Sequence, residues 1–423
     1  MSELNSHNGP LKGLKVLDLS RILAGPTCTQ LFGDLGAEII KIERPGKGDD
    51  TRSWGPPFLK DESGAETSES AYYLSANRNK NSVAVDLTKP EGQQIIQDLA
   101  RQCDVLVENF KAGDLKRYGL DYKAISKINP SLIYCSITGF GMTGPYAQRP
   151  GYDFLIQGMG GIMSLTGKPD EEGGEPTKCG VGIADVMCGM YASVAVLSAL
   201  HARHSSGKGQ QIDISLLDCQ VAWLINQGAG YLISGEVPPR RGNEHPTIVP
   251  YSTFPASDQA FIIAAGNDNQ FARMCKVIGA EHLSKDERFE KNADRVRNRL
   301  VLIPMIEEYT RKQTADFWLN ALEEAGVPCG PVNDLAQTFA DPQIQHREMA
   351  INMPHHLSKA DGVNLIGNPL NFSETKVSYA KAPPVRAEDT RAILSKHLGL
   401  DETKLDELEA NGIIECLTQT QQN

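Results

Sequence analysis

The sequence predicts an α/β protein with a large domain around a mostly parallel, Rossmann-like sheet, built from N- and C-terminal segments, and a second, smaller α/β domain. Two observations lead to this prediction. Short apolar runs alternate with helical patterns along the N-terminal half, which is typical of βαβ units. The length of 423 residues, with 40% hydrophobic and 22% charged residues, fits a globular protein of two or more domains.

The predicted sheet begins with a buried strand at Leu14–Leu19, after which Ala24-Gly25-Pro26 turns the chain into a helix that ends at Gly36. Further strands are expected at Glu38–Glu43, Ser82–Asp86, Asp104–Glu108, Leu132–Thr138 and Gln211–Ser215. Helices are expected at Pro90–Arg101 and Tyr122–Ile128, and one long apolar helix at Leu216–Leu232. This alternation predicts a parallel sheet with helices on both faces.

A polar, proline-containing stretch from Ser234 to Tyr251 marks the expected change of domain. We therefore divide the chain into 1–225, the first segment of the large domain, 226–334, the small domain with its linkers, and 335–423, a C-terminal segment that returns to the large domain. The small domain is expected to contain a strand at Phe261–Ala265 and helices around Gln270–Ile278, Arg299–Thr310 and Ala315–Ala325. A helix near Glu388–His397 is expected to pack back on the large domain.

The net charge of −11 argues against a nucleic-acid partner, because there is no excess of Lys and Arg to neutralise phosphates. Nine cysteines without a C-x-x-C pair indicate buried thiols in a reducing compartment. No run of eighteen apolar residues is present, and Met1–Pro10 lacks the features of a signal or transit peptide. The expected location is therefore the cytoplasm, with no membrane partner.

Three common enzyme motifs are missing, namely G-x-S-x-G, G-x-x-x-x-G-K-[ST] and H-E-x-x-H. Gly139–Gly144 fits G-x-G-x-x-G, but Pro145 and Pro150 prevent the regular helix that would bind a pyrophosphate. His201 and His204 lie at the end of an apolar helix, where the helix dipole explains them better than a metal does. The sequence therefore predicts neither a nicotinamide site nor a metal site.

Asp185 follows the glycine-containing stretch Cys179–Ile183, at a junction with an apolar helix that runs to His204. One interpretation is a helix N-cap, because an aspartate accepts hydrogen bonds from the amides of the first turn. The other is a nucleophilic carboxylate, partly desolvated at the positive end of a helix. Both interpretations stay open at this point, and one geometry can serve both.

Cationic, amide and aromatic side chains gather around the ends of the predicted strands, and open parallel sheets bind ligands at the carboxyl ends of their strands. The residues are Arg44, Arg78, Lys80, Asn109, Phe110 and Arg117. Arginine binds phosphate in a bidentate way, and the phenyl ring of Phe110 can stack on a base. The set predicts a phosphorylated, ring-bearing ligand such as a nucleotide or coenzyme A.

Nine motifs along nearly the whole chain form a specific combination. They are Val16–Pro26, Gly36–Gly46, Gly48–Arg52, Val107–Phe110, Thr138–Pro145, Gly151–Asp153, Val181–Asp185, Gly207–Asp213 and Gly326–Pro331. With them the chain resembles the class III coenzyme A transferases, the family of formyl-CoA transferase and carnitine CoA-transferase. Asn243–His245 and Ile248–Tyr251 make it most similar to the dicarboxylate enzymes of the succinate–hydroxymethylglutarate type.

The resemblance implies an enzyme that moves CoA from an acyl-CoA, such as succinyl-CoA or another dicarboxylyl-CoA, to a carboxylic acid. Asp185 would be the nucleophile, forming an aspartyl–acyl anhydride and then an aspartyl-CoA thioester. CoA would be a carried substrate, with no permanently bound cofactor, and the chains would pair as an interlocked homodimer. By motif position, CoA contacts are expected at Leu23, Ala24, Arg44, Val85, Asn109, Phe110 and Arg117, and Tyr152 and Asp153 are expected near the acyl group.

Two departures from related enzymes bear on the substrate. Racemases of this fold use the histidine of a Gly-His-Asp triplet as a base, whereas this chain has Tyr152, whose ordinary pKa near ~10 makes it a poor base. Formyl-CoA transferase has a run of glycines where this chain has Arg240–His245, which argues against formate and oxalate. We expect Arg240, Arg241 or His245 to bind the distal carboxylate of a dicarboxylic acyl group, and the competing interpretation is a solvated interdomain loop. Acetyl- or formyl-CoA:oxalate transfer, an α-methylacyl-CoA racemase and a non-catalytic CoA-binding scaffold are the alternatives.

Overall fold

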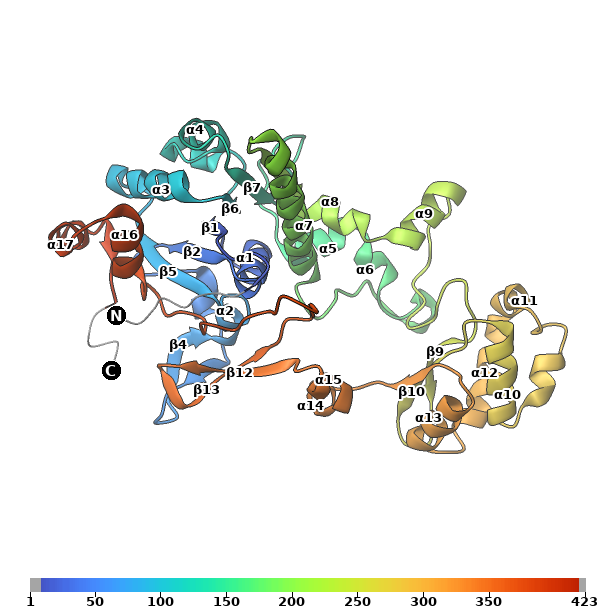
Figure 1. Cartoon of the computed structure of the whole chain (residues 1–423). Helices are drawn as coiled ribbons and strands as arrows, with labels where there is room; N and C mark the ends of the chain where they lie inside the picture. The colour runs from blue at the N-terminus through green and yellow to red at the C-terminus, as the bar shows by residue number, and fades with distance from the viewer. Residues whose placement is uncertain (1–8, 418–423) are drawn as a thin grey trace. The chain divides into compact units, whose positions relative to one another are not determined.

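The computed structural model describes residues 9–417, apart from the side chains of residues 359–361, and divides the chain into two compact units. The large unit contains the described residues up to Gly161, then Cys179–Ala229, and those from Pro342 onwards. The small unit contains Ile162–Lys178 and Gly230–Asp341. In Figure 1 the blue N-terminal strands and the red C-terminal helices lie side by side in the large unit.

The large unit is built around a seven-stranded sheet in the order β14-β5-β2-β1-β6-β7-β8. The strands are β1 (Lys15–Asp18), β2 (Glu38–Glu43), β5 (Lys80–Val85), β6 (Val105–Glu108), β7 (Ile133–Thr138), β8 (Gln211–Ser215) and β14 (Ile414–Glu415). All neighbours pair in parallel except β14, which is antiparallel to β5. The mostly parallel sheet is confirmed, whereas β14 was not predicted.

The strand order reverses at the centre of this sheet. From β1 the chain continues to β2 and β5 on one side, and later to β6, β7 and β8 on the other. A crevice forms at the carboxyl ends of the strands where the order changes, and open α/β sheets bind their ligands there. The loops after β1 and β6 meet at this point, since the N–H of Leu19 donates to the carbonyl of Val107 at 2.8 Å.

Helices cover both faces of the sheet, because alternate strand side chains point into two separate apolar clusters. One cluster includes α3 (Pro90–Gln102), α4 (Tyr122–Ile128), α16 (Thr390–Leu398) and α17 (Glu402–Ala410). The other includes α1 (Ala24–Asp34), α5 (Asp153–Met159), α7 (Ile183–Ser206) and α8 (Leu216–Ala222). The C-terminal helices therefore share one core with the first strands of the chain.

Helices α1 and α7 lie very close together because Gly189 faces α1 without a side chain. A Cβ atom on Gly189 would lie only 2.5 Å from the carbonyl oxygen of Ala24 and 3.0 Å from the Cβ of Thr27. The N-cap residues also touch, since a Cβ on Gly182 would lie 3.1 Å from Cδ2 of Leu23. The N-termini of the two helices therefore meet beside the switch point of the sheet.

Among the described helices, only α7 is long and apolar enough to cross a membrane by these two measures, with a mean hydropathy of 1.7 in its most apolar window. Within the chain, 44% of that window is buried. Its buried residues recur every three or four positions, as in Ala184, Cys188, Ala192, Val196 and Ala199, which is the pattern of a helix packed on one side. The buried face of α7 therefore belongs to the core of the large unit.

The predicted single helix at Leu216–Leu232 was wrong. Helix α8 ends at Ala222, and α9 (Ile225–Ser234) begins after a break. Ile225 has a φ of 39°, a conformation that a continuous right-handed helix does not contain. The large unit also carries α2 (Ala71–Ser75), α15 (Pro342–His346) and two antiparallel hairpins, β3 (Phe58–Lys60) with β4 (Glu66–Ser70) and β12 (Ala350–His355) with β13 (Ser358–Ile366).

The small unit contains a three-stranded antiparallel sheet, in the order β11-β10-β9, with helices around it. The strands are β9 (Tyr251–Pro255), β10 (Ala260–Ala264) and β11 (Cys329–Pro331), and the helices are α6 (Ile162–Leu165), α10 (Asp268–Val277), α11 (Asn292–Arg297), α12 (Arg299–Thr310), α13 (Ala315–Glu324) and α14 (Leu335–Ala340). Its own apolar core includes Phe254, Phe261 and Trp318. The sequence predicted β10, α10, α12 and α13, and missed the two short outer strands.

Candidate active site

A cavity of about 230 Å³ opens at the switch point of the large sheet. It is lined by the loops after β1, β6 and β7 and by the start of α7. Its lining residues include Arg21, Ile22, Leu23, Ala24, Asn109, Phe110, Lys111, Arg149, Tyr152 and Asp185. We call this space the Asp185 cavity.

Asp185 lies in the first turn of α7, half-buried in the wall of the cavity. Burial raises the pKa of its carboxyl group to about 7, and the carboxylate of Asp153 adds to the shift. An ionised carboxylate here is poorly solvated and lies at the positive end of the helix. It is therefore more reactive than a carboxylate in water, and a large share of it is ionised near neutral pH.

Asp153, and not Asp185, satisfies the first amides of α7. Its Oδ1 accepts hydrogen bonds from the N–H of Ala184 at 2.8 Å and from the N–H of Asp185 at 3.3 Å. Gly182, which occupies the N-cap position, provides no side-chain cap. The interpretation of Asp185 as a helix cap was therefore wrong, because Asp185 lies inside the helix and another helix supplies the acceptor.

Gln157 on α5 is fully buried and ties Asp153 to the segment that precedes α7. Its Nε2 donates to Oδ2 of Asp153 at 2.7 Å, and its Oε1 accepts from the N–H of Cys179 at 2.8 Å. Because Asp153 and Gln157 lie one turn apart on α5, they fix the approach to α7 and its first turn together. Sequence reasoning missed Gln157, whose only signal was its spacing of four residues from Asp153.

The sequence and the fold that carry this cavity have counterparts among known proteins. The family model described as CoA-transferase family III matches residues 11–390. The chain belongs to this family. The enzyme is therefore a CoA-transferase, and the resemblance seen in the sequence is confirmed.

Several relatives resemble this CoA-transferase over nearly their whole length. It is 44% identical to the succinate–glutarate CoA-transferase of Agrobacterium fabrum, over 94% of this chain and 98% of that protein. It is 42% identical to the human succinyl-CoA:glutarate CoA-transferase, over 96% of this chain and 90% of that protein. The solved structure of a CAIB/BAIF family protein from Brucella suis matches it with a TM-score of 0.82 and 48% identity, over 92% of this chain and all of that one.

Six of the predicted site residues of the transferase line one cavity, namely Leu23, Ala24, Asn109, Phe110, Tyr152 and Asp185. Arg44 and Arg117 are exposed and do not line it. Arg117 lies 3.9 Å from Asp114, a residue that does. Val85 is buried in the core, beside β14, so its side chain packs there and not on the cavity surface.

Arg240, Arg241 and His245 belong to the small unit. Arg240 already has a carboxylate partner, because its guanidinium pairs with Asp170. Burial and the charge of Arg299 lower the pKa of His245, so that its ring is neutral at pH 7. Within the described part of the chain, the side chain of Arg241 has no hydrogen bond or ion pair. Of the three, Arg241 is the available cation.

Three cations that sequence reasoning missed line the Asp185 cavity, namely Arg21, Lys111 and Arg149. Two cations that the sequence placed in the predicted ligand set have another role. Arg78 and Lys80 are buried, and they pair with Asp34 at 2.6 Å and with Asp18 at 3.2 Å. They hold the fold and do not bind phosphate, because their charges are already neutralised inside the chain.

Tyr72 on α2, also missed, lies near the two carboxylates. Burial raises the pKa of its hydroxyl group to about 12, and Asp185 and Asp153 contribute to the shift. Its ring meets that of Trp54 edge to face, with centroids 5.2 Å apart. A neutral hydroxyl donor therefore lies close to the site, brought there by a short helix that no sequence motif marked.

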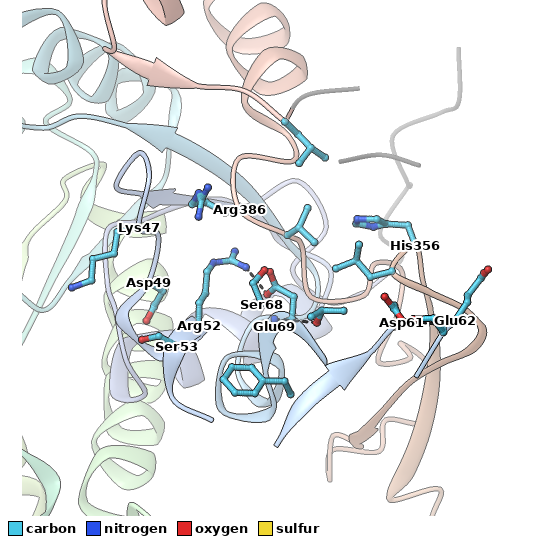
Figure 2. A pocket seen from close by; sticks show the side chains of 16 residues that line it. Lys47, Asp49, Arg52, Ser53, Asp61, Glu62, Ser68, Glu69, His356 and Arg386 are labelled. Atoms are coloured by element: carbon cyan, nitrogen blue, oxygen red, sulfur yellow. Dashed lines mark hydrogen bonds and ion pairs between the residues drawn. The ribbon is translucent and has the colours of Figure 1, made fainter. Parts of the chain in front are cut away.

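A larger cavity of about 910 Å³ elsewhere on the large unit does not contain Asp185 (Figure 2). Its arginines and its lysine are engaged, since Arg52 binds Glu43 at 2.7 Å and Glu69 at 2.6 Å, Arg386 binds Glu415 at 2.7 Å, and Lys47 binds Asp50 at 3.1 Å. We therefore place the chemistry in the Asp185 cavity. Between residues 9 and 417, no group of three or more His, Cys, Asp or Glu side chains is placed to hold a metal ion.

Proposed function

We propose that the enzyme moves CoA from succinyl-CoA to a dicarboxylic acid such as glutarate, with Asp185 as the nucleophile. The observation that carries this proposal is the half-buried carboxylate of Asp185, with a pKa of about 7, in the wall of a cavity at the switch point. Two relatives more than 40% identical to the chain are named for succinate and glutarate, which supports the choice of acids.

In the proposed reaction, the Asp185 carboxylate attacks the thioester carbonyl of succinyl-CoA. A C–O bond forms and the C–S bond breaks, giving a succinyl–aspartyl anhydride and the CoA thiolate. The thiolate attacks the aspartyl carbonyl, which releases succinate and leaves an aspartyl-CoA thioester. The acceptor carboxylate attacks this thioester, and the thiolate then takes the acyl group from the new anhydride and restores Asp185.

The surroundings of Asp185 suit these steps. Partial burial limits access of water to the anhydride and the thioester, both of which water would hydrolyse. Lys111 and Arg149 supply positive charge for the phosphates of CoA, and Phe110 supplies a ring for its adenine. Arg21 also lines the cavity, but its guanidinium already pairs with Asp50 at 2.5 Å. The N-terminus of α7 favours the negative charge that develops on the attacked carbonyl.

Incubation with succinyl-CoA is expected to leave a CoA adduct on Asp185, detected by mass spectrometry of the digested protein. Addition of glutarate should remove the adduct and yield glutaryl-CoA. Asp185→Ala should form no adduct and no product, and an Asp185→Ala variant that still transferred CoA would refute the nucleophile. If the α-hydrogen of the acyl-CoA exchanged for deuterium without transfer of CoA, the racemase alternative would be favoured. If the protein bound CoA but catalysed neither reaction, the non-catalytic scaffold would be favoured.

We propose that Arg241 selects the acceptor by binding its distal carboxylate. An Arg241→Ala variant is expected to raise the KM for glutarate about tenfold, because a lost charge-assisted contact weakens binding by roughly 1.4 kcal/mol, and to leave the KM for a monocarboxylic acceptor unchanged. Arg297→Ala is the control, since Arg297 is an arginine of the same unit that is exposed and already paired with Asp294. If the two variants had equal KM values for glutarate, Arg241 would not select the acceptor.

We propose that the enzyme is an interlocked homodimer whose partner chain completes the site. Large apolar side chains are exposed on α5 and α7, including Phe154 (60% exposed) and Val194 (60% exposed). On α9, Leu232 and Ile233 are more exposed still. A second copy of the chain would remove this surface from water. Sedimentation equilibrium should give twice the chain mass of 46.1 kDa, and a stable active monomer would contradict the dimer.

The cytoplasm is the proposed location. This proposal rests on the scattered cysteines of the sequence, all nine of which are free thiols in the structure.

A further inference from the structure

The loop Ser20–Leu23 forms one wall of the Asp185 cavity in a conformation that its own sequence does not favour. Ile22 has a φ of 71°, in the left-handed region that β-branched residues rarely adopt. Such a conformation persists only where the surrounding structure holds it. Arg21, Ile22 and Leu23 all line the cavity, so whatever holds the loop also sets the shape of the site.

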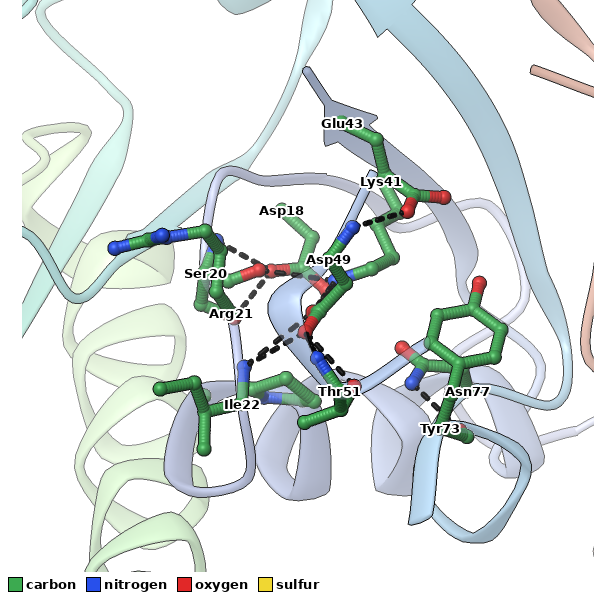
Figure 3. A network of polar contacts seen from close by, with 12 residues as sticks. Asp18, Ser20, Arg21, Ile22, Lys41, Glu43, Asp49, Thr51, Tyr73 and Asn77 are labelled. Atoms are coloured by element: carbon green, nitrogen blue, oxygen red, sulfur yellow. Dashed lines mark hydrogen bonds and ion pairs between the residues drawn. The ribbon is translucent and has the colours of Figure 1, made fainter. Parts of the chain in front are cut away.

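Beneath the loop lies a pair of fully buried charges, Lys41 and Asp49, with N–O distance 2.9 Å (Figure 3). The carboxylate of Asp49 accepts from the N–H of Ile22 at 3.3 Å. The ammonium group of Lys41 donates to the carbonyl of Ser20 at 3.0 Å. One ion pair therefore binds the backbone on both sides of Arg21, in an interior where such bonds are strong.

Asp18, at the end of β1, holds the start of the same loop. It accepts from the N–H of Ser20 at 2.9 Å and from its hydroxyl at 2.5 Å, and it pairs with Lys80. Although burial alone would raise the pKa of Asp18, the charges of Lys80 and Lys41 lower it overall, so the carboxylate stays ionised at neutral pH. At neutral pH the carboxylate of Asp18 therefore carries the negative charge that its interactions with the two lysines require.

Asn109 binds the middle of the loop with both ends of its side-chain amide. Its Oδ1 accepts from the N–H of Arg21 at 2.9 Å, and its Nδ2 donates to the carbonyl of Arg21 at 2.7 Å. From its motif position, Asn109 is expected to contact CoA. In the structure its amide is already engaged with the loop, so its contribution to CoA binding passes through the backbone that it holds.

The loop in turn contacts the helix that carries the nucleophile. The side chain of Leu23 lies against Gly182, at the N-cap of α7, and the carbonyl of Ala24 lies against Gly189 one turn beyond Asp185. A shift of the loop would therefore move the cavity wall and the start of α7 together. A misplacement of about 1 Å is enough to cost an enzyme on the order of a hundredfold in rate.

We propose that Asn109 is a positioning residue for CoA transfer, which fixes the Ser20–Leu23 loop, over the buried Lys41–Asp49 pair, between the Asp185 cavity and the start of the Asp185 helix. The proposal rests on the function proposed above, since it gives Asp185 the role of nucleophile. The test measures CoA binding as well as catalysis, so that this proposal and the proposed role of Asp185 can fail separately.

The test compares Asn109→Ala with Asn129→Ala. Asn129 also binds backbone through its side-chain amide, since its Nδ2 donates to the carbonyls of Ala100 at 3.0 Å and Cys103 at 2.9 Å at the end of α3, but it does not line the cavity. Both variants are expected to lower the melting temperature by similar amounts. Only Asn109→Ala is expected to raise the Kd for free CoA, by about tenfold, and to slow formation of the Asp185 adduct by about tenfold or more. Asn129→Ala should change each by less than about twofold.

Asn109→Asp provides a graded comparison, because a carboxylate can accept from the N–H of Arg21 but cannot donate to its carbonyl. It is expected to bind CoA with an affinity between those of the wild type and Asn109→Ala. Equal effects of Asn109→Ala and Asn129→Ala on CoA affinity and adduct formation would overturn the proposal. If the wild type forms no adduct on Asp185, the nucleophile is refuted, whereas the CoA affinities of the two variants still decide whether Asn109 holds the loop for binding.

Discussion

Replacing Asp185 by asparagine is expected to abolish CoA transfer and, at the same time, to stabilise the fold above pH 7. The amide cannot form an anhydride, so the covalent route is closed. The folded protein holds the proton of Asp185 more tightly than the unfolded chain does, because burial and Asp153 raise its pKa from 3.8 to about 7. Ionisation at pH 8 therefore costs the wild type stability that the neutral, similarly shaped asparagine does not lose.

The sign of this effect sets the pH range in which it is measured. Below about pH 4 the carboxyl group is protonated in both folded and unfolded chains, so Asp185→Asn and the wild type should be equally stable. As the pH rises from 4 to 8, the wild type should lose about 2 kcal/mol relative to the variant, roughly half of what the full shift implies because the side chain is partly exposed. Urea unfolding at a series of pH values measures this difference.

Asp153→Asn serves as the comparison for the same experiment. It removes the like charge and keeps a side-chain oxygen for the first amides of α7, so the pKa of Asp185 should fall and the rise of transfer activity with pH should begin at lower pH. Equal stability of Asp185→Asn and the wild type at every pH would show that the carboxyl group is not perturbed.

Replacing Gly189 by alanine is expected to lower both stability and activity, because the new Cβ would meet a backbone atom that cannot move alone. The contact with the carbonyl of Ala24, at 2.5 Å, would force α1 and α7 apart. Overpacking of this kind costs about 1–3 kcal/mol. The same displacement separates Asp185 from the loop at the start of α1, so kcat should fall by about tenfold or more.

Gly330→Ala is the matched control, since a Cβ at Gly330 meets nothing within 4 Å and the backbone there is unstrained. It should change the free energy of unfolding by less than about 0.5 kcal/mol and leave kcat as it is. Urea unfolding and steady-state transfer assays compare the two variants. A Gly189→Ala enzyme with the stability and kcat of the control would mean that the α1–α7 contact does not hold the site.

The sheet and the cavity could be predicted because each depends on local patterns. Apolar runs such as Glu38–Glu43 mark strands, and the residues that follow β6, Asn109 and Phe110, come to the carboxyl end of the sheet whenever it is parallel. The cap of α7 could not be predicted, because its acceptor, Asp153, lies on a separate helix and reaches α7 only in the folded chain.

The ion-pair partners of the cations could not be predicted from the sequence either. Arg78 and Lys80 lie at the start of β5 and Arg44 lies at the end of β2, yet the first two are buried in ion pairs and Arg44 is exposed. The difference depends on Asp34 and Asp18, which come from earlier elements. A charge near a strand therefore indicates a site only once its own partner is known.

The antiparallel strand β14 has a consequence for the order in which the enzyme is made. It pairs with β5, more than 300 residues earlier in the chain, and α16 and α17 fill the core on the same face. During synthesis the first strands must therefore wait, with the edge of β5 and part of their apolar surface uncovered, until residues 390–415 leave the ribosome. Most of the small unit, Gly230–Asp341, is one continuous stretch made before them. The part of the nascent enzyme most exposed to aggregation is thus its N-terminal segment, which includes β5. A chaperone would have to protect this segment until the C-terminal residues are made.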